Sequence, residues 1–130
     1  DFGRAIKVDF KGSLAQKELM KAVIQKDYEA AKKVAQYLPF IPDHSSFPFD
    51  KFWEFFLKQQ LHLHSGNFRF NRAYIADTLR AGREFSRTVE FKVTLETIWS
   101  LAVSAGIWGI LADLDVDLDY GRVSLEALNH

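Results

Sequence analysis

The chain contains no cysteine, which excludes disulfide bonds and thiolate-bound metal sites. Its 17 basic and 17 acidic side chains balance to a formal net charge of zero, so it lacks the broad positive field of a nucleic-acid-binding protein. Its longest uncharged run, residues 97–112, falls short of the about 20 apolar residues that a membrane-spanning helix needs. We expect no nucleic-acid partner, and we interpret 97–112 as a buried core helix, with a helix lying on a membrane surface as the alternative.

Aromatic side chains are what the chain has in quantity. Hydrophobic residues make up 48% of the 130 residues and aromatic residues 15%, with twelve phenylalanines. A chain of this length suffices for one domain with a sizeable core. We expect the densest aromatic group to supply much of that core, and part of it to pack against a further lobe. Its members are Phe47, Phe49, Phe52, Trp53, Phe55 and Phe56.

Periodic apolar residues between capping signals predict five to six helices, and therefore a mainly α fold. A capping box at residues 13–16 opens the first helix, and Asp27 caps the second, which Pro39 ends. Four later helices are predicted to start at Asp50, Asn71, Thr94 and Ser124. The apolar lines predicted to face the core are Leu19, Met20, Val23 and Ile24 in the first helix, Ala31, Val34, Ala35 and Leu38 in the second, and Tyr74, Ile75, Leu79 and either Ala81 or Phe85 in the fourth. The strand-like segments are short, residues 4–10 and 88–93.

The chain opens with Asp1-Phe2-Gly3, and because its first residue is not Met we expect it to be cut or processed from a longer one. This tripeptide is typical of phosphotransfer sites, in which the Asp carboxylate binds the Mg²⁺ that bridges the ATP phosphates. The Phe packs to set the loop, and the Gly permits a sharp backbone turn. Three ordinary residues also meet by chance, so the interpretation depends on the rest of the chain.

Two further short sequence motifs, called steps below, accompany the tripeptide. They are Lys26-Asp27-Tyr28 after the first helix and Leu114-Asp115-Val116-Asp117 after the long apolar helix. Together they resemble the AarF/UbiB-like (ABC1-type) family of atypical kinases, which is linked with isoprenoid-quinone metabolism, ATP hydrolysis and membrane surfaces. The likeness covers both ends of the chain, whereas residues 40–93 match only as helices of plausible length. An Ala-Pro-Glu sequence and an activation segment are absent, as in that family and unlike ordinary protein kinases.

The resemblance implies that residues 1–130 form a single domain, the C-terminal helical part of a protein-kinase-like C-lobe. Residues 1–12 are then the metal-binding motif with a short linker, and 13–130 are the helical region. In that motif Asp1 is a Mg²⁺ ligand, and Phe2 and Gly3 complete the cofactor-binding tripeptide.

By the same resemblance, the N-terminal lobe, the ATP-contacting lysine and the catalytic loop lie upstream of Asp1. Mg²⁺ and ATP therefore belong to the parent protein. We expect no catalytic residue within the chain, no cofactor for the chain alone, and no phosphotransfer by it. The upstream lobe is the first expected partner, and the family resemblance favours a cytoplasmic or peripheral membrane location.

A second class of protein fits the same residues. The chain is then a helical interaction module without catalysis, whose aromatic face binds a partner helix and whose Asp1-Phe2-Gly3 is a coincidence. Sequence upstream of Asp1 distinguishes the two hypotheses. A strand carrying a Lys and a catalytic loop with Asp and Asn support the kinase, and their absence supports the module.

Alternating acids near the C-terminus imitate a calcium-binding loop, formed by Asp115, Asp117, Asp119 and Glu126. Gly121 stands one position late for an EF-hand, so the preferred prediction is an extended exit strand whose apolar side chains point inward. Those side chains are Leu114, Val116 and Leu118. Cation binding by the acids stays open.

Three histidines are the remaining candidates for metal ligands: His44, His62 and His64. Residues two apart on a helix point in nearly opposite directions, so His62 and His64 cannot easily share one ion there. A histidine near a helix C-terminus is favoured by the helix dipole, and this structural role is the preferred interpretation.

Arginines make the central segment basic: Arg69, Arg72, Arg80, Arg83 and Arg87. Arg80, Arg83 and Arg87 share one helical face, for which a solvated surface is the ordinary outcome. The functional alternative is contact with anionic lipid headgroups, which makes an anionic membrane surface the second expected partner.

Overall fold

The computed structural model describes residues 10–38, 41, 46–89 and 95–129, with the backbone alone for residues 10–13 and 95–101. Within these residues the fold is mainly α, as the sequence predicts, with one 3-10 turn (η2) and two short strands. The elements in chain order are α1 (Phe10–Gln25), α2 (Tyr28–Ala35), α3 (Phe49–Gln59), η2 (Leu61–Leu63), β1 (Asn67–Arg69), α4 (Arg72–Thr88), α5 (Leu95–Leu114), β2 (Asp117–Asp119) and α6 (Tyr120–Leu128).

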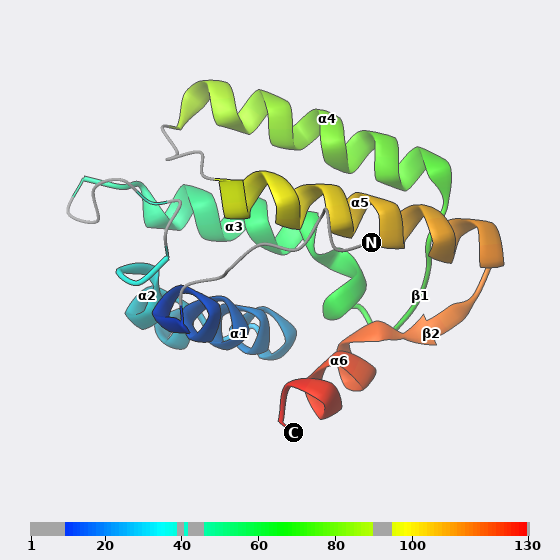
Figure 1. Ribbon diagram of the computed structural model, residues 1–130, viewed down its shortest axis with the longest axis horizontal. Coiled ribbons are helices and arrows are strands. Elements are labelled where there is room, and N and C mark those ends of the chain that lie inside the picture. The colour runs from blue at the N-terminus through cyan, green and yellow to red at the C-terminus, as the bar shows by residue number, and fades with distance from the viewer. Residues whose placement is uncertain (1–9, 39–40, 42–45, 90–94, 130) are drawn as a thin grey trace.

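The helices fall into two groups joined by the strands (Figure 1). In the first group α4 packs against both α3 and α5, and it runs opposite to α5; in the second, α1 packs against α2 and α6. Strands β1 and β2 pair antiparallel, with Asn67 opposite Asp119 and Arg69 opposite Asp117. This ladder ties the segment before α4 to the end of α5, and it leads directly into α6.

One hydrophobic core is shared by both groups of helices. The predicted apolar lines of the first two helices point into it, because residues three and four apart lie on one face of a helix. The aromatic group enters the core through Phe52 and Trp53, whereas Phe47, Phe49 and Phe56 are half-buried against it. The buried residues include Leu19, Val23, Ala31, Leu38, Ile41, Phe52, Trp53, Phe70 and Tyr120.

Several predicted helix starts are wrong. Helix α1 begins at Phe10, so Ser13 lies inside the helix and is not its N-cap, and the predicted boundary between residues 12 and 13 falls within α1. Helix α3 begins at Phe49, which places Asp50 in its first turn. Helix α6 begins at Tyr120 and not at Ser124, because the Asp119 side chain accepts from the Arg122 amide and caps the helix.

Other boundary predictions are confirmed or fall outside the described residues. Asp27 and Asn71 cap α2 and α4 as predicted. Pro39 and Thr94 lie outside the described residues, as do most members of the two strand-like segments. The described ends of those segments, Phe10 and Thr88, are helical.

Helix α5 is not the fully buried helix that the sequence predicts. Trp108 and Leu111 pack against the core, but Ile107, Ile110 and Leu114 are 50%, 60% and 63% exposed. The helix is apolar on all sides, so its sequence alone cannot indicate which side faces water. None of the described helices combines the length and the apolar character that crossing a membrane requires.

Helix α4 faces the core with a slightly different set of residues from the predicted one. Tyr74 and Ile75 pack against the core as predicted, and of the alternatives Ala81 and Phe85 it is Phe85 that does so, whereas Leu79 is exposed. Thr78 is buried in place of Leu79, and its carbonyl accepts from Gln59 of α3 at 2.8 Å.

Candidate functional site

The predicted metal ligand Asp1 and its neighbours Phe2 and Gly3 lie outside the described residues. The two other steps that carry the family resemblance are described, and each lies where a helix ends. Their geometry is therefore the first part of the candidate site.

The Lys26-Asp27-Tyr28 step forms a tight turn between α1 and α2. Lys26 has a positive φ of 54°, its amide donates to the Val23 carbonyl, and the Asp27 amide donates to the Ala22 carbonyl. These two bonds form a Schellman motif, which satisfies carbonyls at the end of α1. The Asp27 carboxylate then accepts from the Ala30 amide at 3.1 Å and opens α2.

The turn directs Tyr28 towards the start of α3. Its hydroxyl donates to the Asp50 carboxylate, and this bond together with burial raises the pKa of Tyr28. Its ring packs edge-on against Phe49 and Trp53, with centroids 5.5 and 6.3 Å away. One tyrosine thus couples the α1–α2 turn to α3.

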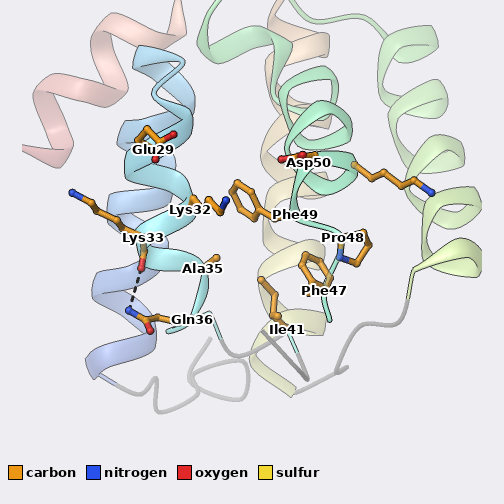
Figure 2. Close-up of a pocket in the computed structure, with 11 residues that line it drawn as sticks. Glu29, Lys32, Lys33, Ala35, Gln36, Ile41, Phe47, Pro48, Phe49 and Asp50 are labelled. Atoms are coloured by element: carbon orange, nitrogen blue, oxygen red, sulfur yellow. Dashed lines mark hydrogen bonds between the residues drawn. The ribbon is translucent and has the colours of Figure 1, made fainter. Parts of the chain in front are cut away.

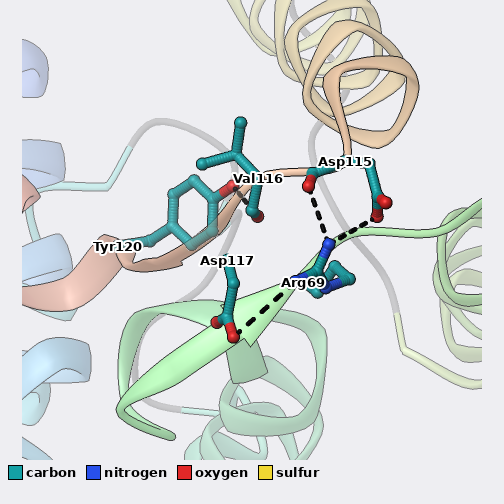
Figure 3. A network of polar contacts seen from close by, with 5 residues as sticks. All are labelled: Arg69, Asp115, Val116, Asp117 and Tyr120. Carbon is teal, nitrogen blue, oxygen red and sulfur yellow. Dashed lines mark hydrogen bonds and ion pairs between the residues drawn. The ribbon is translucent and has the colours of Figure 1, made fainter.

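The Leu114-Asp115-Val116-Asp117 step is held by Arg69 of β1 (Figure 3). The Arg69 guanidinium donates to the Asp115 carbonyl at 2.8 Å and lies 2.9 Å from the Asp115 carboxylate, and this contact raises the pKa of Arg69. Asp117, its partner in the strand register, lies 3.9 Å away. The Tyr120 hydroxyl donates to the Val116 carbonyl at 3.2 Å. We call this arrangement of Arg69, Asp115 and Asp117 the arginine clasp.

The acids near the C-terminus have structural roles that differ from those of a calcium loop. Asp115 and Asp117 contact Arg69, Asp119 caps α6, and Glu126 pairs with Arg122 at 3.5 Å. The described residues contain no group of acids and histidines with the geometry of a metal site.

The extended exit strand is confirmed in β2, but its predicted inward set is only partly right. Leu118 packs against the core, whereas Leu114 and Val116 are exposed.

The two described histidines point to different partners. His64 donates from Nε2 to the Leu57 carbonyl at 2.7 Å. His62 is buried among aromatic rings, with the Phe70 and Trp108 centroids 4.9 and 5.5 Å away. Its Nδ1 has no hydrogen-bond partner among the described residues, and burial lowers its pKa to about 4. His44 lies outside the described residues.

A groove of about 840 Å³ lies between α2 and the start of α3 (Figure 2). This volume falls within the range of ligand pockets. Its apolar lining comes from Ala35 of α2, from Ile41, and from Phe47, Pro48 and Phe49 at the start of α3. The apolar floor therefore exists only because the two helices are brought together.

Charged side chains line the edge of the groove: Glu29, Lys32, Lys33, Asp50 and Lys51. The Lys32 ammonium lies 5.7 Å from the centre of the Tyr28 ring. The sequence interpretation did not propose this site, because its residues belong to three segments of the chain. The adjacent Lys32 and Lys33 shortly before an aromatic loop were the available signal.

The predicted basic face of α4 is present and exposed. Arg80 pairs with Asp77 at 3.0 Å, whereas Arg83 and Arg87 have no ion pair with any described residue. Glu84 lies on the same helix, so the local excess of positive charge is modest. The face is directed away from the core side of α4, which is marked by Thr78.

Comparison with protein-family models, with curated proteins and with solved structures gave no match.

Proposed function

We propose that this chain is the C-terminal helical part of an AarF/UbiB-like atypical kinase or ATPase, and that it supplies the Mg²⁺-binding Asp1 of that enzyme. Mg²⁺ and ATP would bind in the parent protein, where Asp1 places the metal and Phe2 and Gly3 shape the loop. The chain alone lacks the ATP-contacting lysine and the catalytic loop, so it is inactive by itself. A link with isoprenoid-quinone metabolism follows from the resemblance alone.

The observation that carries the proposal is the position of the two steps. Lys26-Asp27-Tyr28 closes one helix and opens the next, and Leu114-Asp115-Val116-Asp117 ends the long apolar helix inside the arginine clasp. Residues that give a sequence its family resemblance are expected at such positions, because turns and caps restrict residue type more than exposed helix faces do.

Magnesium-dependent ATP turnover tests the proposal. The coding sequence upstream of Asp1 is expected to encode a Lys-bearing strand and a catalytic loop with Asp and Asn. The parent protein should hydrolyse or transfer from ATP, and Asp1→Ala should remove that activity, while the 130-residue chain shows none. Turnover by the chain alone that Asp1→Ala abolishes would contradict the proposal.

An anionic membrane surface is the second proposed partner, contacted through Arg80, Arg83 and Arg87. Support comes from the exposure of these side chains and from the absence of an ion pair at Arg83 and Arg87 within the described residues. Each arginine near an anionic surface contributes about 1 kcal/mol. The Arg80→Glu, Arg83→Glu variant should bind anionic vesicles less tightly, and Arg122→Glu on α6 is the matched control. Equal binding of anionic vesicles by the unchanged chain, the double variant and the control would contradict this proposal.

The interaction module remains a second candidate function, with a different surface from the predicted aromatic face, since Phe52 and Trp53 are buried in the core. The observation that favours it is a row of exposed apolar side chains on α5, Ile107, Ile110 and Leu114. They recur at helical spacing and would suit a partner helix. Upstream sequence without kinase elements, together with a partner whose binding is lost in Ile110→Glu, would favour this candidate over the kinase.

A further inference from the structure

His62 lies where the two groups of helices meet. It is the middle residue of η2, and its side chain is buried. Four aromatic rings surround the imidazole, with ring centroids between 4.9 and 6.3 Å away. They belong to Phe68 of β1, Phe70, Trp108 of α5 and Tyr120 of α6. A single side chain therefore joins α5 in the first group to α6 in the second.

The surroundings of His62 suit a neutral imidazole and oppose a charged one. A protonated imidazole carries an N–H on both nitrogens, and Nδ1 of His62 has no hydrogen-bond partner among the described residues. The charged ring would therefore leave a buried donor unpaired. Burial first, and the charge of His64 second, lower the pKa of His62 to about 4. Opening the site to water relieves such a charge, because an unpaired buried charge is far more costly than a neutral group.

The titratable groups on the surrounding elements do not compensate a charge on His62. Each of them has a hydrogen bond or an ion pair of its own. They are His64 after η2, Arg69 of β1, Asp117 and Asp119 of β2, Tyr74 of α4, Asp113 of α5, and Tyr120, Arg122 and Glu126 of α6. Within the described residues, the charge that acts on the pKa of His62 is that of His64, which has the same sign.

Helix α6 is the element that can move away from His62 at the smallest cost. It has 9 residues, too few for a helix to be stable alone. It packs mainly on α1 and on η2, where Gly121 lies directly against the Leu63 carbonyl. Tyr120, its first residue, covers one side of His62. Because the arginine clasp holds β2, an outward movement of Tyr120 and Gly121 hydrates His62 without parting α3, α4 and α5.

We propose that His62 is an acid-sensitive latch, and that protonation of its imidazole releases α6 from η2 while α3, α4 and α5 stay folded. At neutral pH the uncharged ring is enclosed by the four aromatic rings, and in acid the charged ring meets water beside the displaced α6. The latch is independent of Asp1 and of the proposed function.

Hydrogen exchange of the backbone amides, measured by NMR as protection factors at pH 7 and pH 5, tests the latch. Protection of the α6 amides should fall roughly twentyfold between these two values, because His62 binds a proton near pH 6.5 when hydrated and near pH 4 when enclosed. In His62→Leu the protection of α6 should not change with pH. His64→Gln, which removes the other described histidine, is the matched control and should keep the fall.

Low concentrations of urea distinguish the release of α6 from unfolding of the whole chain. Protection of the α6 amides should be insensitive to urea below about 1 M, because release exposes little surface, whereas protection of the α3 amides should fall. If His62→Leu does not fold, the unchanged chain still provides the test, through the nitrogen NMR shifts of the His62 ring followed against pH.

Three outcomes would each overturn the proposal. The first is a pKa of His62 at or above 6.5, as attraction between the charged ring and the aromatic rings would give. The second is equal protection of the α6 amides at pH 7 and pH 5. The third is a response of the α6 amides to urea that matches the response of the α3 amides.

Discussion

At the scale of single residues, the buried side chain of His62 makes the stability of the fold depend on pH. It is only 6% exposed, and burial lowers its pKa from 6.5 to about 4. The unfolded chain therefore binds a proton at His62 as pH falls through 6.5, whereas the folded chain does so only near pH 4. Stability is full above pH 6.5 and falls between pH 6.5 and 4, by up to about 3 kcal/mol from this residue. Chemical denaturation at a series of pH values measures this loss.

The control for this prediction is His62→Leu, which keeps an apolar side chain of similar size and removes the titrating group. The free energy of unfolding of the unchanged chain, relative to that of His62→Leu, should vary with pH only between pH 6.5 and 4. Parallel curves for the two proteins would show that His62 does not titrate differently in the folded and unfolded chains.

Two glycines in helices have opposite requirements. A Cβ on Gly121 would lie 1.9 Å from the Leu63 carbonyl oxygen, a backbone atom that cannot rotate away. Gly121→Ala should therefore destabilise the fold by about 3 kcal/mol, through displacement of η2 from α6. Gly82 in α4 has nothing within 4 Å of its Cβ position. Gly82→Ala should stabilise by up to about 1 kcal/mol, because Ala is the better helix former. Thermal unfolding of both variants measures the contrast. Unchanged thermal stability of the Gly121→Ala protein would contradict the packing at this position.

At the scale of elements, the α1–α2 turn contains a helix cap at Asp27 and a strained backbone conformation at Lys26, and the effect of each on stability can be measured separately. Asp27→Ala removes the side-chain acceptor of the Ala30 amide and should cost about 1 kcal/mol. Lys26→Gly relieves the positive φ of 54° and should stabilise by about 0.5–1 kcal/mol, since glycine adopts this conformation without a steric penalty. Urea unfolding midpoints report both changes. Two changes of the same sign would contradict the turn geometry.

The same turn shows why caps can be predicted and other helix starts cannot. Asp27 and Asn71 each accept from an amide three residues further along the chain, so their role is contained in the local sequence. Ser13 carries the same local signal, yet α1 continues in front of it to Phe10. A capping pattern indicates where a helix can start, and the whole chain decides whether it starts there.

At the scale of the whole molecule, the outer face of α5 should contribute little to stability. Ile107 and Ile110 are half-exposed or more, so Ile107→Gln with Ile110→Gln should change the free energy of unfolding by less than about 1 kcal/mol. Phe70, which is 1% exposed and packs against His62 and Trp108, is the contrast, and Phe70→Ala should cost about 3–5 kcal/mol. A large loss in the double variant would show that another part of the chain covers this face.

Much of the fold could be predicted, and most of the candidate site could not. Apolar spacing identified the helices and the buried lines through Leu19, Val23 and Ala31. The arginine clasp escaped prediction because Arg69 is far along the chain from Asp115 and Asp117. The groove escaped for the same reason, since Lys32 and Phe49 become neighbours only when α2 packs beside α3.

The sequence by itself determined the helical class and the caps at Asp27 and Asn71, because periodicity and capping act within a few residues. Only the tertiary structure decided which side of the uniformly apolar α5 faces water, which acids Arg69 holds, and where Lys32 meets an aromatic floor. Those outcomes depend on contacts between residues that are distant in the chain, and no local pattern encodes them.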